Sequence, residues 1–465
     1  MSMTYRPIRS STPTNADKPD GCAAAPPTSA EPARSGAESS GRIVAVDLVR
    51  ALALFGMFAV NLGLHEEWAA AGVPDWLADL PHGRSSATFA VLAGWSLALL
   101  SGGRAARTER GRRQAAVKIA IRGVLLIVLG TALVAAGATI PVIIASYGVF
   151  FLLSLPFLRL GVRGLAVAAG VVAVVGPVIV RYVHLLASPA QLERLLPYDP
   201  VIGLGQLFTA GFGDIIHGGE PPYPGYEFPL AGYELGALLI YGFYPTGAFL
   251  TYVLAGMALG RLDLARRATQ LRLAVLGPVL MIVGYGVPLL LHWLRYPVIP
   301  PFDIPEPEPA PQSLAEFKTA LAGLEPWSLV EESSAYQIDR ERSGLLDAYA
   351  HSGTTFEILG NLGVAIALLV IATALLTRWE WLRSLLAPVA AAGTMTLTAY
   401  TAQALGFAVL EDGSPIRWLP QTPQAVFGWF VVGSIVFAFA WSQLFRRGPL
   451  EQLFYLATKP ARLIR

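Results

Sequence analysis

The sequence predicts an all-α fold: a polytopic helical membrane protein with about ten transmembrane helices and both termini in the cytosol. Two features lead to this prediction. Apolar residues make up 54% of the chain and charged residues only 14%, whereas soluble proteins carry about a quarter charged residues. The chain also contains several windows of about 20 apolar residues, the length that crosses a bilayer as a helix.

The number of spans follows from the distribution of Lys and Arg, because cytoplasmic loops of membrane proteins carry an excess of both. With residues 1–41 placed in the cytosol, the short inner segments carry 19 basic residues, and the short outer connections carry only Arg84 and Arg417. Removing any one span would destroy this asymmetry. The predicted spans are 42–63, 85–102, 119–137, 140–158, 164–185, 239–259, 273–294, 354–376, 385–410 and 423–445.

These spans form one membrane domain, 42–445, flanked by two cytosolic tails. The composition of residues 1–41 (Ser, Pro, Ala, Gly, Thr) predicts disorder, and residues 446–465 predict a basic tail. Two extracytoplasmic loops are long, at about 186–238 and 295–353. The run SLAEFKTALAGLEPW in the second loop predicts a short amphipathic helix.

The single cysteine, Cys22, excludes an internal disulfide or a cysteine metal cluster. No apolar stretch precedes it, so we expect neither a lipoprotein nor a cleaved signal peptide. We expect no bound metal. We also expect no nucleic-acid partner, because the basic residues follow the topology and form no single patch.

The first span contains polar side chains that a lipid-facing helix would not carry. Asp47, Arg50 and Asn61 lie in the run RIVAVDLVRALALFGMFAVNLG. A charge at mid-helix costs about 2.5–3.5 kcal/mol on insertion scales. At 100° per residue these positions and His65 share one stripe, with Arg50 and Asn61 about 16 Å apart along the axis. We expect this stripe to line a passage through the bundle.

Asp47 and Arg50 have two interpretations. Their i, i+3 spacing allows an ion pair that only fixes helix packing. Alternatively, Arg50 binds an anionic group entering from the cytosol and Asp47 orients it, since the Arg fork donates bidentate hydrogen bonds to phosphate. Arg122, a few residues inside the third span, supports the second interpretation because topology alone does not require it.

His65 and His82 flank the first outer loop. A histidine at the outer mouth can act as a general base for an acceptor hydroxyl or amine, or receive an acyl group as nucleophile. A solvated loop side chain is the competing interpretation for each. Arg84 leads into the second span, where it either binds a carboxylate or snorkels at the interface.

The C-terminal half adds further polar candidates. His351 begins the run HSGTTFEILGNLG, in which Glu357 lies near enough to the interface to be hydrated and Asn361 continues the polar stripe one turn deeper. In the ninth span, Tyr400 and Gln403 share a helix face and are candidates for lining a cavity. The predicted substrate-binding residues are therefore Arg84, His351, Glu357, Tyr400 and Gln403.

Four segments match patterns of known membrane proteins. In the first span, the pattern R-x4-D-x2-R-G-x-A-x2-G-M with a later Asn is matched at Arg42, Asp47, Arg50, Ala53, Gly56, Met57 and Asn61, with Ala51 in place of its Gly. The second span matches F-x4-G-x-S at Phe89, Gly94 and Ser96. These segments resemble the catalytic domain of lysosomal heparan-α-glucosaminide N-acetyltransferase and its bacterial relatives. HSGTTFEILGNLG and AAGTMTLTAYTAQ resemble the C-terminal half of bacterial YeiB-type proteins.

The resemblance implies a transmembrane acyltransferase, in which acyl-CoA enters from the cytosolic side and the acyl group reaches an acceptor on the far side. It also implies a catalytic histidine in the first luminal loop. His82 occupies that loop, although its spacing from Asn61 differs and the usual Trp-Asn-Gly context is missing, so His65 remains an alternative. In the broader superfamily a histidine often stands at the position of Asn61, which implies that this position faces the reaction.

We therefore hypothesise a membrane acyltransferase that moves an acyl group, expected to be acetyl, from cytosolic acyl-CoA to an extracytoplasmic glycan or envelope molecule. Asp47, Arg50 and Arg122 would bind the acyl-CoA, and Asn61 with His82 or His65 would be catalytic. The expected location is a bacterial plasma membrane, with the lipid bilayer as partner and homo-oligomerisation left open.

Two other functional classes, a transporter and a non-catalytic scaffold, also fit parts of the sequence. A secondary transporter or a lipid or glycan flippase would share the intramembrane charges, but it requires coupling-ion carboxylates at mid-membrane. A non-catalytic membrane scaffold would tolerate the loss of Asn61 and both histidines.

Overall fold

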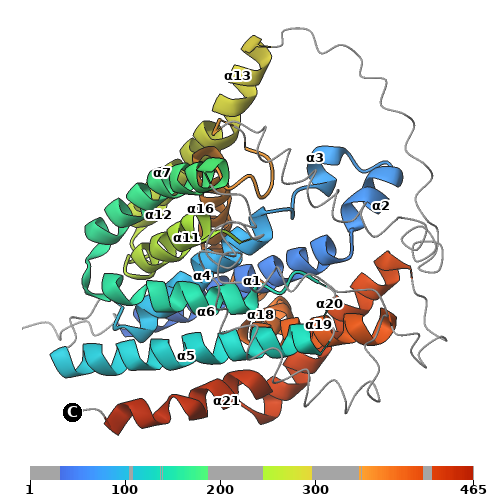
Figure 1. Ribbon diagram of the computed structural model, residues 1–465. Coiled ribbons are helices and arrows are strands. Elements are labelled where there is room, and N and C mark those ends of the chain that lie inside the picture. The colour runs from blue at the N-terminus through green and yellow to red at the C-terminus, as the bar shows by residue number, and fades with distance from the viewer. Residues whose placement is uncertain are drawn as a thin grey trace, which may run out of the picture.

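The computed structural model describes residues 32–103, 108–136, 138, 140–186, 244–295, 345–346, 348–411 and 422–463. This part of the chain consists of helices and their connections, with no strand (Figure 1). The long outer loops and the predicted amphipathic helix at 313–327 lie almost wholly outside the described residues.

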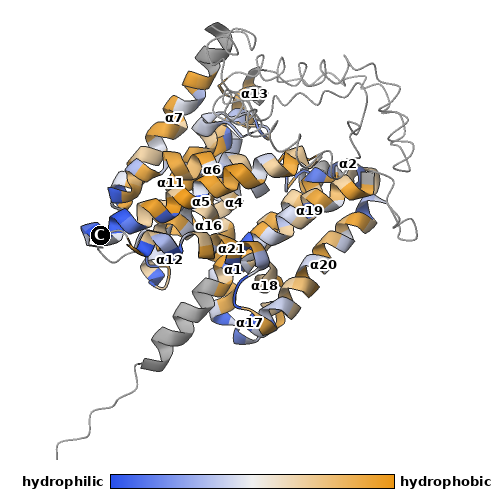
Figure 2. Ribbon diagram, turned by 60° about the horizontal axis from the view of Figure 1, so that its bottom comes forward, coloured by the Kyte–Doolittle hydropathy of each residue, from blue (hydrophilic) through white to orange (hydrophobic). Residues whose placement is uncertain are grey.

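All ten predicted spans coincide with helices. Six helical segments are long and apolar enough to cross a membrane, and four of the expected spans are shorter apolar helices. Together with the apolar character of most helices (Figure 2), this confirms an integral membrane protein that is all-helical over the described residues. The helices are α1 (Pro32–Asn61), α4 (Arg84–Leu100), α5 (Glu109–Ala135), α6 (Ile144–Leu153), α7 (Val162–Leu186), α11 (Thr246–Gly260), α12 (Arg267–Met281) with α13 (Val287–Arg295), α16 (Thr355–Arg378), α18 (Ala387–Thr394) with α19 (Thr396–Glu411), and α20 (Pro423–Leu444).

The centre of the bundle is formed by α1, α4, α11 and α16. Helix α11 is buried along nearly its whole length and packs against α4, α7 and α16. Gly94 of α4 and Gly256 of α11 lie at the crossing of these two helices, where a Cβ atom at either position would collide with the other backbone. Small residues thus allow the close approach typical of membrane helices. By contrast, α12 and α20 each expose several large apolar side chains, as expected for a surface in lipid.

The first helix differs from its prediction at both ends. It begins at Pro32, so it includes residues 32–41, which the composition assigned to a disordered tail. It ends at Asn61, because Gly63 adopts a left-handed conformation with φ of 65° and a new helix, α2 (Leu64–Ala70), begins there. The prediction that His65 continues the stripe of Asp47, Arg50 and Asn61 on one helix is therefore wrong.

The ninth span was predicted as one continuous helix and is broken at Met395, between α18 and α19. The break leaves backbone donors at the start of α19 without helical partners. Oε1 of Glu451 accepts from the amides of Leu397 and Thr398 at 2.9 and 3.2 Å, and Oε2 accepts from the Thr398 hydroxyl at 2.6 Å. Glu451 belongs to α21 (Pro449–Ala457), so the C-terminal segment caps a helix inside the bundle.

The seventh span contains a π-helical turn, Ile282–Gly286, between α12 and α13. Such turns often occur at functional sites. Here the turn directs Tyr285 toward α16, where its hydroxyl donates to Oδ1 of Asn361 at 2.6 Å. The short helices α2 and α3 (Asp75–Ala78) lie at the end of the bundle away from α17 (Glu380–Leu385) (Figure 2).

Candidate functional site

Three histidines meet at the α2–α3 end of the bundle. The ring centroid of His82 lies 5.6 Å from that of His65 and 5.6 Å from that of His351. His65 and His82 come from the first outer loop and His351 from the segment before α16, nearly 270 residues later in the chain. We call these three residues the histidine cluster. The sequence singled out each of them, and the fold brings them together.

A glycine allows the approach of His82 and His351. Gly83 has φ of 68°, a conformation that favours glycine. A Cβ atom at Gly83 would lie 3.3 Å from Cβ of Ala350 and 3.4 Å from Oε1 of Glu357, which is tighter than ordinary contact. The residue after His82 can therefore turn sharply and pack against the residue before His351.

His82 is paired with a carboxylate. Its Nδ1 lies 3.1 Å from Oδ1 of Asp79, three residues earlier in the turn between α3 and α4. A carboxylate accepts and does not donate, so it holds the neutral imidazole with the proton on Nδ1 and leaves Nε2 as the basic nitrogen. Burial lowers the pKa of His82 below its ordinary value of 6.5, opposed by Asp79 and assisted by His65 and Arg84. This is the arrangement of a general base that is neutral at physiological pH.

Arg84 makes hydrogen bonds to the backbone of the loop that contains Asp79 and His82. Its Nη1 donates to the backbone oxygens of Asp79 and His82 at 3.0 and 3.4 Å, and its guanidinium lies 5.0 Å from the ring centre of Tyr285. Arg84 is therefore neither a solvated side chain nor one that only snorkels. Its role in binding a substrate carboxylate stays a prediction.

His351 is held in a strained backbone conformation by Glu357. Its φ of 63° is the only left-handed value at a non-glycine residue in the described ranges, and such strain is found preferentially at functional sites. Oε1 of Glu357 accepts from the amide of His351 at 2.7 Å, and Oε2 accepts from the amide of Gly353 at 2.6 Å and the hydroxyl of Ser352 at 3.2 Å. Glu357 is only 5% exposed, so the expectation that it is hydrated is wrong.

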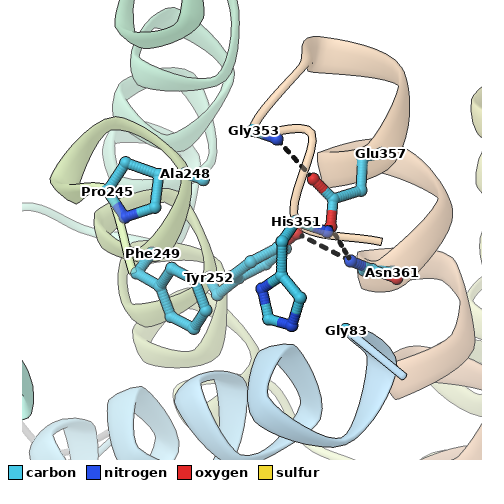
Figure 3. A pocket seen from close by; sticks show the side chains of 9 residues that line it. All are labelled: Gly83, Pro245, Ala248, Phe249, Tyr252, His351, Gly353, Glu357 and Asn361. Atoms are coloured by element: carbon cyan, nitrogen blue, oxygen red, sulfur yellow. Dashed lines mark hydrogen bonds between the residues drawn. The ribbon is translucent and has the colours of Figure 1, made fainter. Parts of the chain in front are cut away.

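A small pocket, with about 10 Å³ of enclosed space, lies beside His351 between α11 and α16 (Figure 3). In Figure 3 the imidazole of His351 lies between Phe249 and Gly83, and Tyr252 extends from α11 toward Asn361. The pocket thus has an apolar wall on α11 and a polar wall on α16. Its lining is Gly83, Pro245, Ala248, Phe249, Tyr252, His351, Gly353, Glu357 and Asn361.

The charged end of the α1 stripe faces the bundle interior. Nη1 of Arg50 donates to Oδ1 of Asp47 at 2.7 Å and to the backbone oxygen of Gly393 at 3.2 Å, and Nη2 donates to Ser96 at 3.2 Å. Arg50 therefore joins α1 to α4 and α18. The structural ion pair exists, and binding of an anion by Arg50 stays a prediction.

The polar end of the stripe also faces inward. Nδ2 of Asn61 donates to Oε1 of Gln403 on α19 at 3.3 Å. Gln403 is fully buried, and no partner for its Nε2 is found among the described residues. Tyr400, on the same helix, instead accepts from the amide of Ile143 and donates to the backbone oxygen of Pro141, so its hydroxyl fastens α19 to the segment before α6.

Arg122 lies on α5 near Arg447, a residue in the turn before α21, and the two guanidiniums repel each other. The buried Nε of Arg122 has no hydrogen-bond partner within the described ranges. A buried donor without a partner, close to a second positive charge, favours the binding of an anion.

In the described ranges, no group of three His, Cys, Asp or Glu side chains is arranged to hold a metal ion. The histidine cluster is a set of neighbouring rings, tilted by 54° and 69° to one another.

Three residues of the site were missed by the sequence analysis: Asp79, Tyr252 and Tyr285. The spacing of Asp79 and His82 at i, i+3 could have indicated the pair. Tyr252 and Tyr285 lie in apolar spans where an aromatic residue predicts packing, so no local pattern distinguishes them.

Two known protein families match parts of the chain. Residues 42–196 match the family described as "Heparan-alpha-glucosaminide N-acetyltransferase, catalytic", and residues 333–459 match the family described as "Protein of unknown function (DUF418)". The chain is similar to these two families, each over less than half of its length. The first match contains Asn61 and His82 and the second contains His351, so the histidine cluster joins the two matched regions. No curated protein and no solved structure matches the chain. The first match indicates an acyltransferase-type function in the membrane.

Proposed function

We propose that this protein transfers an acyl group, acetyl in the simplest case, from acyl-CoA on the cytosolic side to an extracytoplasmic acceptor in a bacterial envelope. The observation that carries the proposal is the Asp79–His82 pair within the histidine cluster. A carboxylate-oriented, neutral imidazole at the end of a polar stripe is suited to remove a proton from an acceptor.

In the proposed reaction the acceptor attacks the thioester carbonyl carbon of acyl-CoA. Nε2 of His82 takes the proton that the acceptor loses, the new acyl bond forms, and the carbon–sulfur bond breaks. The CoA thiolate leaves and takes up a proton. His65 stays an alternative base, although Asp79 orients His82.

The Asn61–Gln403 pair is the proposed oxyanion site. The thioester oxygen becomes negative during attack, and preorganised N–H donors in a dry site stabilise such charge strongly. Gln403 is buried, Asn61 is partly buried at the end of α1, and Nε2 of Gln403 has a proton to donate.

Arg122 and Arg50 are the proposed anchors of the CoA phosphates. Arg122 is the better candidate for binding phosphate, because its Nε is buried without a partner in the described part of the chain. Arg50, in contrast, makes three internal hydrogen bonds. Phosphate recognition by Arg is bidentate and charge-assisted.

The transporter hypothesis has less support. It requires a carboxylate that can bind a coupling ion at mid-membrane. Asp47 is committed to Arg50, and Glu357 accepts hydrogen bonds on both oxygens.

Thermal stabilisation by CoA tests the proposal. A ligand that binds only the folded protein raises its melting temperature in a concentration-dependent manner. We expect CoA to stabilise the purified protein and Arg122→Ala to weaken that effect. Arg113→Ala is the matched control, because Arg113 lies on the same helix with 64% of its side chain exposed. No stabilisation at saturating CoA, or equal behaviour of both variants, would count against the proposed donor site.

A further inference from the structure

The hydroxyl of Tyr252 has a proton to offer in the pocket beside His351. Tyr252 is 1% exposed, and its oxygen accepts from Nδ2 of Asn361 at 3.2 Å. The orientation of the Asn361 amide is fixed from both sides: Nδ2 also donates to Oε1 of Glu357 at 3.2 Å, and Oδ1 accepts from Tyr285 at 2.6 Å. Tyr252 is therefore the acceptor in its bond with Asn361.

The carboxylate of Glu357 secures this assignment. It accepts from two backbone amides, from Ser352 and from Asn361, so both oxygens are occupied as acceptors and the amide nitrogen must face it. No acceptor for the proton of Tyr252 itself is found among the described residues. That proton is available to a molecule in the pocket.

His351 lines the same pocket and brings a proton-accepting ring to it. Its ring is also in edge-to-face contact with His82 at 5.6 Å. A group bound between Tyr252 and His351 would therefore accept a hydrogen bond from the phenol and give its own proton to the imidazole. The bound group must therefore be able both to accept a hydrogen bond from Tyr252 and to donate a proton to His351.

We propose that the acceptor group is a hydroxyl, so that the product is an ester; this inference rests on the proposed acyltransferase function. A hydroxyl oxygen has two lone pairs, so it can accept from Tyr252 with one and attack the thioester with the other, whereas a neutral amine has a single lone pair, which the attack requires, and a protonated amine has none. The enclosed space of about 10 Å³ is about what a single water-sized group requires. It fits the reacting end of an acceptor, with the remainder outside.

The step balances in atoms and charge. The hydroxyl oxygen forms a bond to the acyl carbon, the carbon–sulfur bond breaks, and the proton of the hydroxyl passes through the ring of His351 to the base, His82. The histidine cluster then returns a proton to the departing CoA thiolate. The products are an O-acyl ester and free CoA.

Chemical analysis of the envelope separates the possible outcomes. Glycans and lipids of the native host are compared with those of a strain lacking the protein, and acyl groups are divided into esters, released by mild alkali, and alkali-stable amides. We expect the deletion to remove acyl groups from the ester fraction. Loss from the amide fraction alone would overturn the hydroxyl assignment and leave the acyltransferase standing. No loss in either fraction would overturn both.

Complementation with variants tests the two residues. Tyr252→Phe keeps the ring and removes the phenolic proton, and His351→Asn removes the ring that passes the proton to His82 but tolerates a left-handed backbone. We expect both to lower the recovered ester at least tenfold at equal membrane abundance. Tyr285→Phe is the matched control, since it also removes a tyrosine hydroxyl bonded to Asn361 but not one that lines the pocket. Equal losses in Tyr252→Phe and Tyr285→Phe would show that Tyr252 acts only through the Asn361 network, and would overturn its assigned role.

Discussion

His82 shows how single residues in this site obtain their chemistry from their surroundings. Its ring is partly buried against two other histidines, and one of its nitrogens is tied to Asp79. The sequence could identify His82 as a candidate because a histidine at the mouth of a bundle is unusual. The pairing with Asp79 and His351 depends on how the loop turns at Gly83, which residue types alone do not specify.

The lowered pKa of His82 predicts the pH dependence of acyl transfer. The base is active when neutral, and burial keeps it neutral to a pH below 6.5. The acid limb of the rate profile should therefore lie below pH 6.5. Asp79→Asn removes a charge that raises this pKa, so the limb should move to still lower pH. A limb at or above 6.5, or a shift upward in Asp79→Asn, would contradict this assignment.

The lowered pKa of His82 also makes the folded protein less stable at acid pH. Because the pKa of His82 is lower in the folded protein than the ordinary 6.5, the unfolded chain binds this proton first as pH falls. The contribution of His82 to stability is therefore complete above 6.5 and is lost as the pH falls toward the folded-state pKa. Asp79, His65 and Arg84 are the charged and titratable neighbours that set this window.

At the scale of elements, the hydropathy pattern predicted the apolar helices of the bundle, but not their interruptions or the short helices between them. The spans are apolar for about 20 residues, so their positions follow from composition. The breaks at Gly63 and Met395 arise from backbone conformations that tertiary contacts stabilise. These are also the places where polar groups from different helices meet.

Gly83→Ala tests the turn that brings the loop histidine to α16. A left-handed conformation costs a non-glycine residue about 1–2 kcal/mol, and the new methyl would also press on Ala350. Gly72→Ala is the matched control, because Gly72 has φ of 84° and nothing within 4 Å of the added atom. We expect both variants to melt earlier, and only Gly83→Ala to lose acyl transfer. Equal activity in the two would mean that the approach of His82 to His351 is not needed.

Glu451→Ala tests the cap on α19. The variant leaves the amides of Leu397 and Thr398 without their carboxylate acceptor, at a cost of about 1–3 kcal/mol for buried donors. We expect a lower melting temperature of the purified protein. Glu109→Ala is the control, since Glu109 makes only an exposed ion pair with Arg113 at 3.2 Å, which contributes little. If both variants melt alike, α21 does not stabilise α19.

At the scale of the whole molecule, the charge distribution and the apolar segments predicted a helical membrane protein whose polar stripe faces inward. The described structure agrees, because Arg50 and Asn61 contact α18 and α19 and not the lipid-facing surface. The histidine cluster could not be predicted as a unit. It is assembled from residues nearly 270 positions apart, and one sequence contains no direct record of such proximity.

Labelling of cysteines in intact cells tests the predicted orientation. Cys22 precedes the first span, so a membrane-impermeant maleimide should label it only after permeabilisation. In a Cys22→Ser background, Trp76→Cys on α3 should react in intact cells, because Trp76 is 72% exposed and its loop is predicted to be extracytoplasmic. Labelling of both sites from the same side would refute the topology.

Transfer of radiolabel from acetyl-CoA into the membrane fraction of the native host tests the chemistry of the site most directly. The rate should fall 10²–10⁴-fold in His82→Ala, the usual effect of removing a general base. Asp263→Asn, which alters a comparable i, i+3 ion pair with Arg266 in a different turn, should keep the parental rate. Equal transfer by the parent and His82→Ala would contradict the assignment of this site.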